Sequence, residues 1–60
     1  MERVEVYFPG DNVILIYEVG EECEKGIVID IQVQFNPLLV EVVTDGGEIT
    51  IAGAPFYASK

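Results

Sequence analysis

The clearest hydrophobic pattern in the chain runs from Ile27 to Phe35. Alternate residues from Ile27 onward are apolar and mostly β-branched, and the residues between them are mostly polar. A period of two is typical of a half-buried β-strand, whereas a helix would scatter the apolar residues around its circumference. The pattern therefore predicts a central strand over Ile27–Phe35. Its other side would face solvent or form a polar contact surface, and it carries Val28, Asp30, Gln32 and Gln34.

Two turn signals predict a three-stranded meander in the C-terminal half. Asn36-Pro37 ends the central strand, with either a cis bond or a loop longer than two residues. Asp45-Gly46 is typical of a type I′ hairpin turn. Strands over Leu38–Val43 and Glu48–Ile51 then share one buried face with the central strand. The predicted pairs are Phe35/Leu38, Val33/Val40, Ile31/Val42, Val42/Ile49 and Val40/Ile51.

The N-terminal part predicts two more strands. Alternation of Val4, Val6 and Phe8 indicates a short first strand, and Pro9-Gly10 suits the centre of a type II turn. The second strand, Val13–Val19, is apolar on both faces at its start. Such a strand is covered by barrel closure, by a bend that changes its face, or by a partner chain. Residues 20–26 are expected to form an acidic loop bounded by glycines.

The whole chain, residues 1–60, is expected to be a single domain. It contains no helical pattern long enough to cover a sheet. We therefore expect an all-β fold, a small five-stranded barrel with an antiparallel meander, because closure removes exposed sheet edges.

One stretch resembles a known family. Pro9-Gly10-Asp11-Asn12-Val13, followed by a strand and then by Gly26-Ile27-Val28, resembles the opening of SH3-like barrels of the KOW and related types. The resemblance spans residues 8–31 and implies an SH3-like barrel. The chain departs from the family in lacking the basic residues with which such barrels often touch RNA. It also lacks tryptophan, so the groove of true SH3 domains for proline-rich peptides is not supported.

The charge balance restricts the partners. Three basic residues face eleven acidic ones, for a net charge of −8. This balance disfavours direct binding of nucleic acid and of anionic membranes, and it allows a basic protein partner. The charge can equally serve solubility alone. No membrane-spanning apolar run and no signal peptide is evident in the sequence, so we expect a cytoplasmic protein.

The residue types needed for catalysis are scarce. The chain has no histidine and one cysteine, Cys23, which sits among carboxylates that oppose thiolate formation. No nucleophile–base pair or Cys/His metal site can be assembled, and the acidic loop lacks the ligand spacing of an EF-hand. We therefore expect neither an enzyme nor a cofactor or metal.

Binding is the function that remains. We expect a small non-enzymatic protein-binding module, acting as an accessory or regulatory subunit or as a homo-oligomer. One alternative is an acidic nucleic-acid mimic of viral type that inhibits a nucleic-acid-binding protein; another is a KOW-like nucleic-acid-associated domain. The candidate contact residues are apolar (Ile14, Ile16, Val28, Leu39, Val43), tyrosine (Tyr17, Tyr57) or acidic (Glu21, Glu22, Glu24).

Overall fold

A computed structural model of the chain describes residues 2–8, 13–53 and 57–59, and these residues form two antiparallel sheets. The predicted Pro9-Gly10 turn lies outside the described residues. One sheet has the order β2-β1-β7 and the other the order β3-β4-β5-β6. The all-β, antiparallel prediction is confirmed, with seven strands in the described residues where five were expected. The strands are β1 Arg3–Phe8, β2 Val13–Glu18, β3 Glu22–Cys23, β4 Gly26–Phe35, β5 Leu38–Thr44, β6 Gly47–Ala52 and β7 Tyr57–Ser59.

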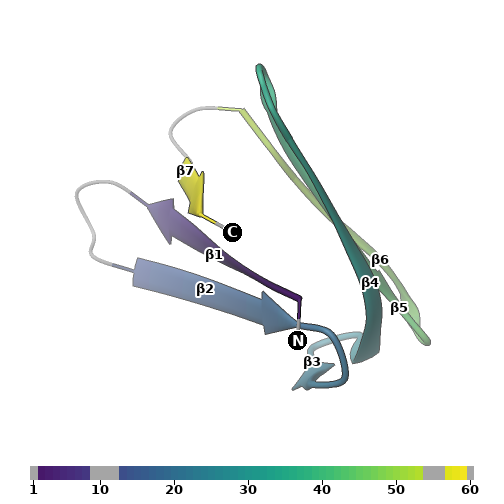
Figure 1. Cartoon of the computed structure of the whole chain (residues 1–60). Helices are drawn as coiled ribbons and strands as arrows, with labels where there is room; N and C mark the ends of the chain where they lie inside the picture. The colour runs from purple at the N-terminus through teal and green to yellow at the C-terminus, as the bar shows by residue number, and fades with distance from the viewer. Residues whose placement is uncertain (1, 9–12, 54–56, 60) are drawn as a thin grey trace.

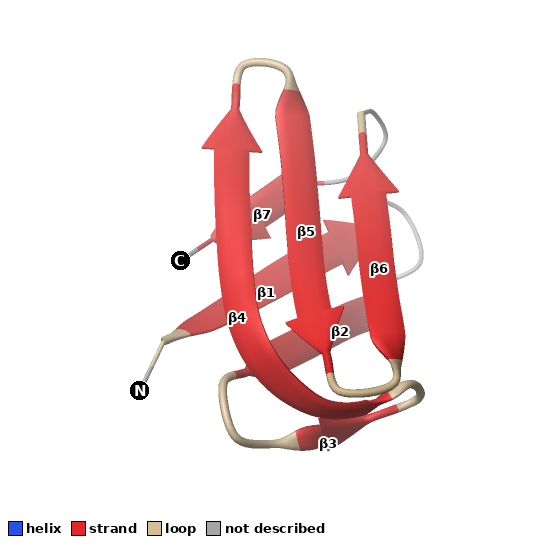
Figure 2. Cartoon of the chain, turned by 90° about the vertical axis from the view of Figure 1, so that its right-hand side faces the viewer, coloured by secondary structure: helices blue, strands red, loops and turns tan. Residues whose placement is uncertain are grey.

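The two sheets enclose the core between them. They come together at the β3 end and diverge toward the turn between β4 and β5 (Figure 1). Turned by 90°, β1, β2 and β7 lie behind the meander and cross it at an angle (Figure 2). The buried apolar side chains come from both sheets, so each sheet covers the inner face of the other. They are Val4, Val6, Tyr17, Val28, Ile31, Val40 and Val42.

The meander has the predicted register. β4 pairs with β5, and β5 pairs with β6, through all five of the predicted residue pairs. The turn between β4 and β5 contains only Asn36 and Pro37, and the bond between them is cis, one of the two predicted possibilities. Apolar residues of three strands therefore line one face, which packs on the smaller sheet except at the β4–β5 turn, where Phe35 is 57% exposed and not buried as predicted.

The predicted alternation fails in the first part of β4. Val28 pairs with Thr44 and Asp30 pairs with Val43, so Ile29 is an extra residue with no partner on β5. This β-bulge shifts the alternation by one residue. Val28 is consequently buried, at 2% exposure, while Ile29 is 56% exposed. The predicted solvent-facing position of Val28 is wrong, because a strict period of two cannot register an inserted residue. Figure 2 shows β4 bending toward β3 at this end.

The turn between β5 and β6 lies at the predicted residues, but its geometry differs. The glycine of this turn with a positive φ angle is Gly47, at 142°, and not Gly46. Type I′ requires positive φ at both central residues, so that prediction is wrong. Gly46 has another role: a Cβ at this position would lie 2.0 Å from the backbone oxygen of Lys25. The turn therefore packs directly against the β3–β4 hairpin.

The described residues include no helix, and hence no helix with the length and hydropathy needed to cross a membrane.

Candidate functional site on the outer face of β1 and β2

The predicted contact residues Ile14 and Ile16 lie on the outer face of the smaller sheet. β1 and β2 pair Val4 with Tyr17 and Glu5 with Ile16. Val4 and Tyr17 are buried, so the neighbouring residues of each strand point away from the core. Ile14 is 51% exposed and Ile16 is 55% exposed. The strand that the sequence showed to be apolar on both faces is therefore covered on only one of them by the described residues.

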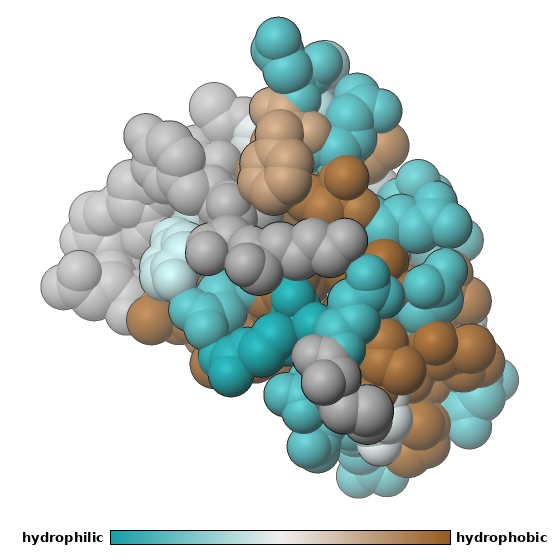
Figure 3. Space-filling view, viewed as in Figure 1, coloured by the Kyte–Doolittle hydropathy of each residue, from teal (hydrophilic) through white to brown (hydrophobic). Residues whose placement is uncertain are grey.

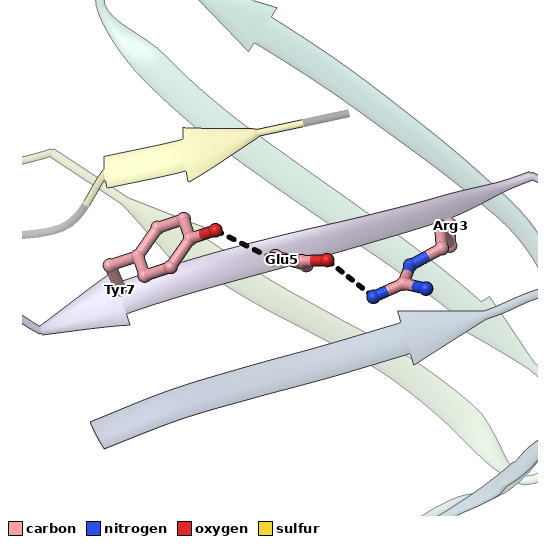
Figure 4. A network of polar contacts seen from close by, with 3 residues as sticks. All are labelled: Arg3, Glu5 and Tyr7. Atoms are coloured by element: carbon pink, nitrogen blue, oxygen red, sulfur yellow. Dashed lines mark hydrogen bonds and ion pairs between the residues drawn. The ribbon is translucent and has the colours of Figure 1, made fainter. Parts of the chain in front are cut away.

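A chain of polar contacts runs along β1 on the same face. Glu5 accepts hydrogen bonds from the guanidinium of Arg3 and from the hydroxyl of Tyr7, the latter with an oxygen–oxygen distance of 2.6 Å (Figure 4). The bond from Tyr7, assisted by Arg3, holds the pKa of the Glu5 carboxyl below its usual value. The same bond, which is lost when the phenol gives up its proton, raises the pKa of the Tyr7 hydroxyl, and burial adds to the effect. Glu5 is therefore an ionised acceptor already engaged at neutral pH.

β2 is an edge strand, and the pairing fixes which of its backbone groups face outward. Among the described strands, only β1 pairs with β2. The backbone N–H of Val19 donates to the oxygen of Glu2 at 2.9 Å, which makes Glu2 and Val19 a hydrogen-bonded pair. Such pairs recur at every second residue of an antiparallel ladder, so residues 15 and 17 also bond to β1. The N–H and C=O groups of Ile14 and Ile16 and the N–H of Glu18 therefore point away from β1, along the edge, while the C=O of Glu18 accepts from the N–H of Glu21 at 3.0 Å.

Acidic side chains follow the apolar part of β2. Glu18 pairs with Arg3 across the sheet, and Glu21, Glu22 and Glu24 are exposed in the next residues. The hydroxyl of Tyr17 donates to Glu24 at 3.1 Å. Burial, followed by this carboxylate, raises the pKa of Tyr17 to about 12. The predicted contact residue Tyr17 is thus 5% exposed and serves in the core, where its hydroxyl ties the β3–β4 turn to β2.

The other predicted contact residues do not join Ile14 and Ile16. Leu39 and Val43 are half-buried on the outer face of β5, which belongs to the other sheet. The outer faces of two packed sheets point in opposite directions, and Val28 is in the core between them. The apolar candidate residues therefore do not form one continuous surface in the structure. The side chain of Tyr57 lies outside the described residues, although its backbone is in β7.

A second exposed apolar area lies at the bulged end of β4. Ile27 is 40% exposed and Ile29 is 56% exposed. Figure 3 shows apolar surface gathered where the lower ends of β4, β5 and β6 lie, and a smaller apolar area beside β2.

Away from both areas, an open hollow of about 240 Å³ is lined mainly by polar side chains: Gln32, Val33, Gln34, Leu39 and Glu41. The described residues contain no group of three or more Cys, Asp or Glu side chains arranged to hold a metal ion.

Two features of these surfaces were not predicted from the sequence. The Arg3–Glu5–Tyr7 contacts were missed, although residues two apart on a strand share a face and a basic, an acidic and a phenolic group at that spacing are a usable signal. The exposure of Ile29 had no comparable signal, because it depends on the bulge.

Comparison of the chain with protein-family models, with curated proteins and with solved structures found no match.

Proposed function

We propose that this chain is a small non-enzymatic protein-binding module, and that the outer face of β1 and β2 is its contact surface. The observation that carries the proposal is the exposure of Ile14 and Ile16, each more than half accessible on a strand without a partner on its other side among the described residues. The two isoleucines are neighbours on the same face, and removing their apolar surface from water favours binding of a partner that covers them. The module would serve as an accessory or regulatory subunit or as a homo-oligomer.

The polar groups beside the isoleucines suit a contact surface. Glu5 pairs with Ile16 and Tyr7 pairs with Ile14 across the sheet, so a tyrosine and an ordered carboxylate border the apolar pair. Tyrosine is favoured at interfaces because it offers apolar area together with a hydroxyl. Because Arg3 and Tyr7 hold the carboxylate in place, less side-chain freedom is lost on binding.

We also propose that the two sheets are the halves of an SH3-like barrel. The support is the bent strand β4, whose first residues pair with β3 and whose remainder pairs with β5. The sequence resemblance of residues 8–31 to such barrels adds to this. Fold alone does not fix function, so the binding proposal depends on the β1–β2 face and not on the barrel.

The test compares two double variants with the same charge change. Ile14→Lys/Ile16→Lys alters the proposed face, and Ile27→Lys/Ile29→Lys alters the other pair of exposed isoleucines. Each tagged protein is used to capture partners from a lysate of the source organism, and each is sedimented alone at high concentration. We expect wild type and the β4 variant to retain one partner or one oligomer that the β2 variant loses. Equal retention by both variants, or a monomer with no partner, would overturn the proposal.

A further inference from the structure

We infer that the free edge of β2 takes up an extended segment of a basic partner protein as an additional antiparallel strand. This inference rests on the proposed function and identifies the chemistry of the partner. In such an addition, backbone hydrogen bonds supply affinity and alternate side chains supply specificity. The backbone groups open to the partner strand are the N–H and C=O of Ile14 and Ile16 and the N–H of Glu18; the C=O of Glu18 already accepts from the N–H of Glu21 at 3.0 Å.

The edge of β2 lacks the features that usually prevent strand addition. Protected edges carry charged side chains, proline, a bulge or very few residues. β2 has six residues, and the first five, Val-Ile-Leu-Ile-Tyr, include no charge, proline or glycine. β6, at the edge of the other sheet, has the exposed residues Glu48 and Thr50 on its outer face. The part of β4 beyond its pairing with β3 has Asp30, Gln32 and Gln34. β2 is therefore more open to strand addition than β6 or this part of β4.

The distribution of charge along β2 gives the partner an orientation. The strand runs from Ile14 and Ile16 to Glu18, and the exposed Glu21 and Glu22 follow. Of the basic residues on the described surface, Arg3 contacts Glu5, and the ammonium of Lys25 lies 3.3 Å from the backbone oxygen of Glu48. An antiparallel strand begins opposite Glu18 and ends opposite Ile14. The complementary segment therefore has lysine or arginine first and alternating apolar residues after them.

A second copy of this chain fits the same edge less well. Each copy carries a net charge of −8, so association brings like charges together. β2 itself has no basic residue, so the antiparallel pairing of two β2 strands places no positive charge of one β2 opposite Glu18 of the other. A second copy thus offers no positive charge to Glu18, whereas a basic segment does.

The probe is a nine-residue peptide with three lysines followed by alternating threonine and valine, titrated into isotope-labelled protein and followed by NMR. Two control peptides carry three glutamates or three threonines in place of the lysines. We expect the lysine peptide to shift the amide signals of Ile14, Ile16 and Glu18, with affinity at least about tenfold above that of the glutamate peptide at low salt. Equal binding of the three peptides, or binding of none, would overturn the basic-partner inference.

Backbone pairing is tested with one variant and one set of modified peptides. Ile16→Pro removes an N–H that does not bond to β1, and Ile16→Thr keeps that N–H while removing apolar surface. We expect the proline variant to lose peptide binding and the threonine variant to retain part of it. Two further peptides carry N-methyl groups on alternate residues, one on the odd positions and one on the even positions. One of them should lose binding and the other should keep it, and this comparison needs no altered protein. If both methylated peptides bind as well as the unmodified peptide, side chains alone make the contact.

The outcomes separate this inference from the function on which it rests. If the peptides fail but the Ile14→Lys/Ile16→Lys variant still loses a captured partner, the protein-binding function stands and strand addition by a basic segment is wrong. If sedimentation of the chain alone shows a dimer that Ile16→Pro disrupts, the occupant of the edge is a second copy.

Discussion

Asp45 and Ile27 are joined by two hydrogen bonds although they lie in different hairpins. The backbone N–H of Ile27 donates to the Asp45 carboxylate at 2.9 Å, and the N–H of Asp45 donates to the backbone oxygen of Ile27 at 3.1 Å. Gly26 permits this approach, since a Cβ there would lie 2.0 Å from the same carboxylate oxygen. Thr44, buried at 6% exposure, adds a contact between its hydroxyl and the backbone oxygen of Lys25 at 3.2 Å. These contacts hold the β5–β6 turn against the start of β4.

Asp45→Ala should lower the free energy of unfolding by about 1 kcal/mol, because the N–H of Ile27 loses its acceptor. In a domain of this size the loss corresponds to a melting temperature lower by roughly 4–8 °C. Asp45→Asn keeps an acceptor oxygen and should recover part of the loss. Glu48→Ala removes the same charge from an exposed neighbouring position and should have little effect. Thermal melts in which Asp45→Ala and Glu48→Ala are indistinguishable would contradict the account of this contact.

Because of the bulge in β4, truncating two adjacent residues, Val28 and Ile29, should have very different effects on stability. Val28→Ala should lower the free energy of unfolding by about 2 kcal/mol, because it leaves a cavity in the core. Ile29→Ala should change it by less than about 0.5 kcal/mol, because its side chain is more than half exposed. Urea denaturation measures both. A strand without the bulge would give the reverse order, with Ile29 the costly position.

Tyr17 should make the fold sensitive to alkaline pH. Its pKa in the folded protein is raised to about 12 from an ordinary value of 10.0, so the folded state favours the neutral hydroxyl. The resulting stabilisation is complete below pH 10 and is lost as the pH rises toward 12. The advantage of wild type over Tyr17→Phe in free energy of unfolding should therefore shrink across this range. An advantage that stays constant or grows with pH would show that the hydroxyl is not held as described.

The charge balance predicts a response to salt. With a net charge of −8, repulsion within the compact chain opposes folding, and salt screens that repulsion. The melting temperature should rise as sodium chloride is increased to about 0.3 M, where the Debye length has fallen to roughly 6 Å. A melting temperature that is flat or falls over this range would mean that attractive pairs outweigh the repulsion.

The meander could be predicted residue by residue, and the reason is physical. The Asn36-Pro37 and Asp45-Gly46 turns each fix a register, and both registers place Val40 and Val42 on the same buried face. Independent local signals that agree in this way leave little freedom. The bulge at Ile29 had no such support, because it arises where β4 leaves β5 and pairs with β3, and nothing in the alternation marks that point.

The candidate site could be predicted only in part. The sequence showed that β2 has apolar residues on both of its faces. Ile14 and Ile16 share one of these faces, and for that reason they could be named as candidate contact residues. It could not show that Leu39 and Val43 face away from that pair, because their relation depends on how the two sheets pack. The place of β2 at a sheet edge is likewise a property of the topology.

The most direct test of the central claim is amide hydrogen exchange along β2, measured by NMR for the free chain and for the chain with its partner or the lysine peptide. In the free chain the amides of Ile14, Ile16 and Glu18 should exchange rapidly, while those of Leu15, Tyr17 and Val19 are protected by β1. Binding should slow exchange at Ile14, Ile16 and Glu18 by at least about tenfold. Uniform protection along β2 in the free chain, or no change at these three amides on binding, would contradict the claim that this edge binds a protein strand.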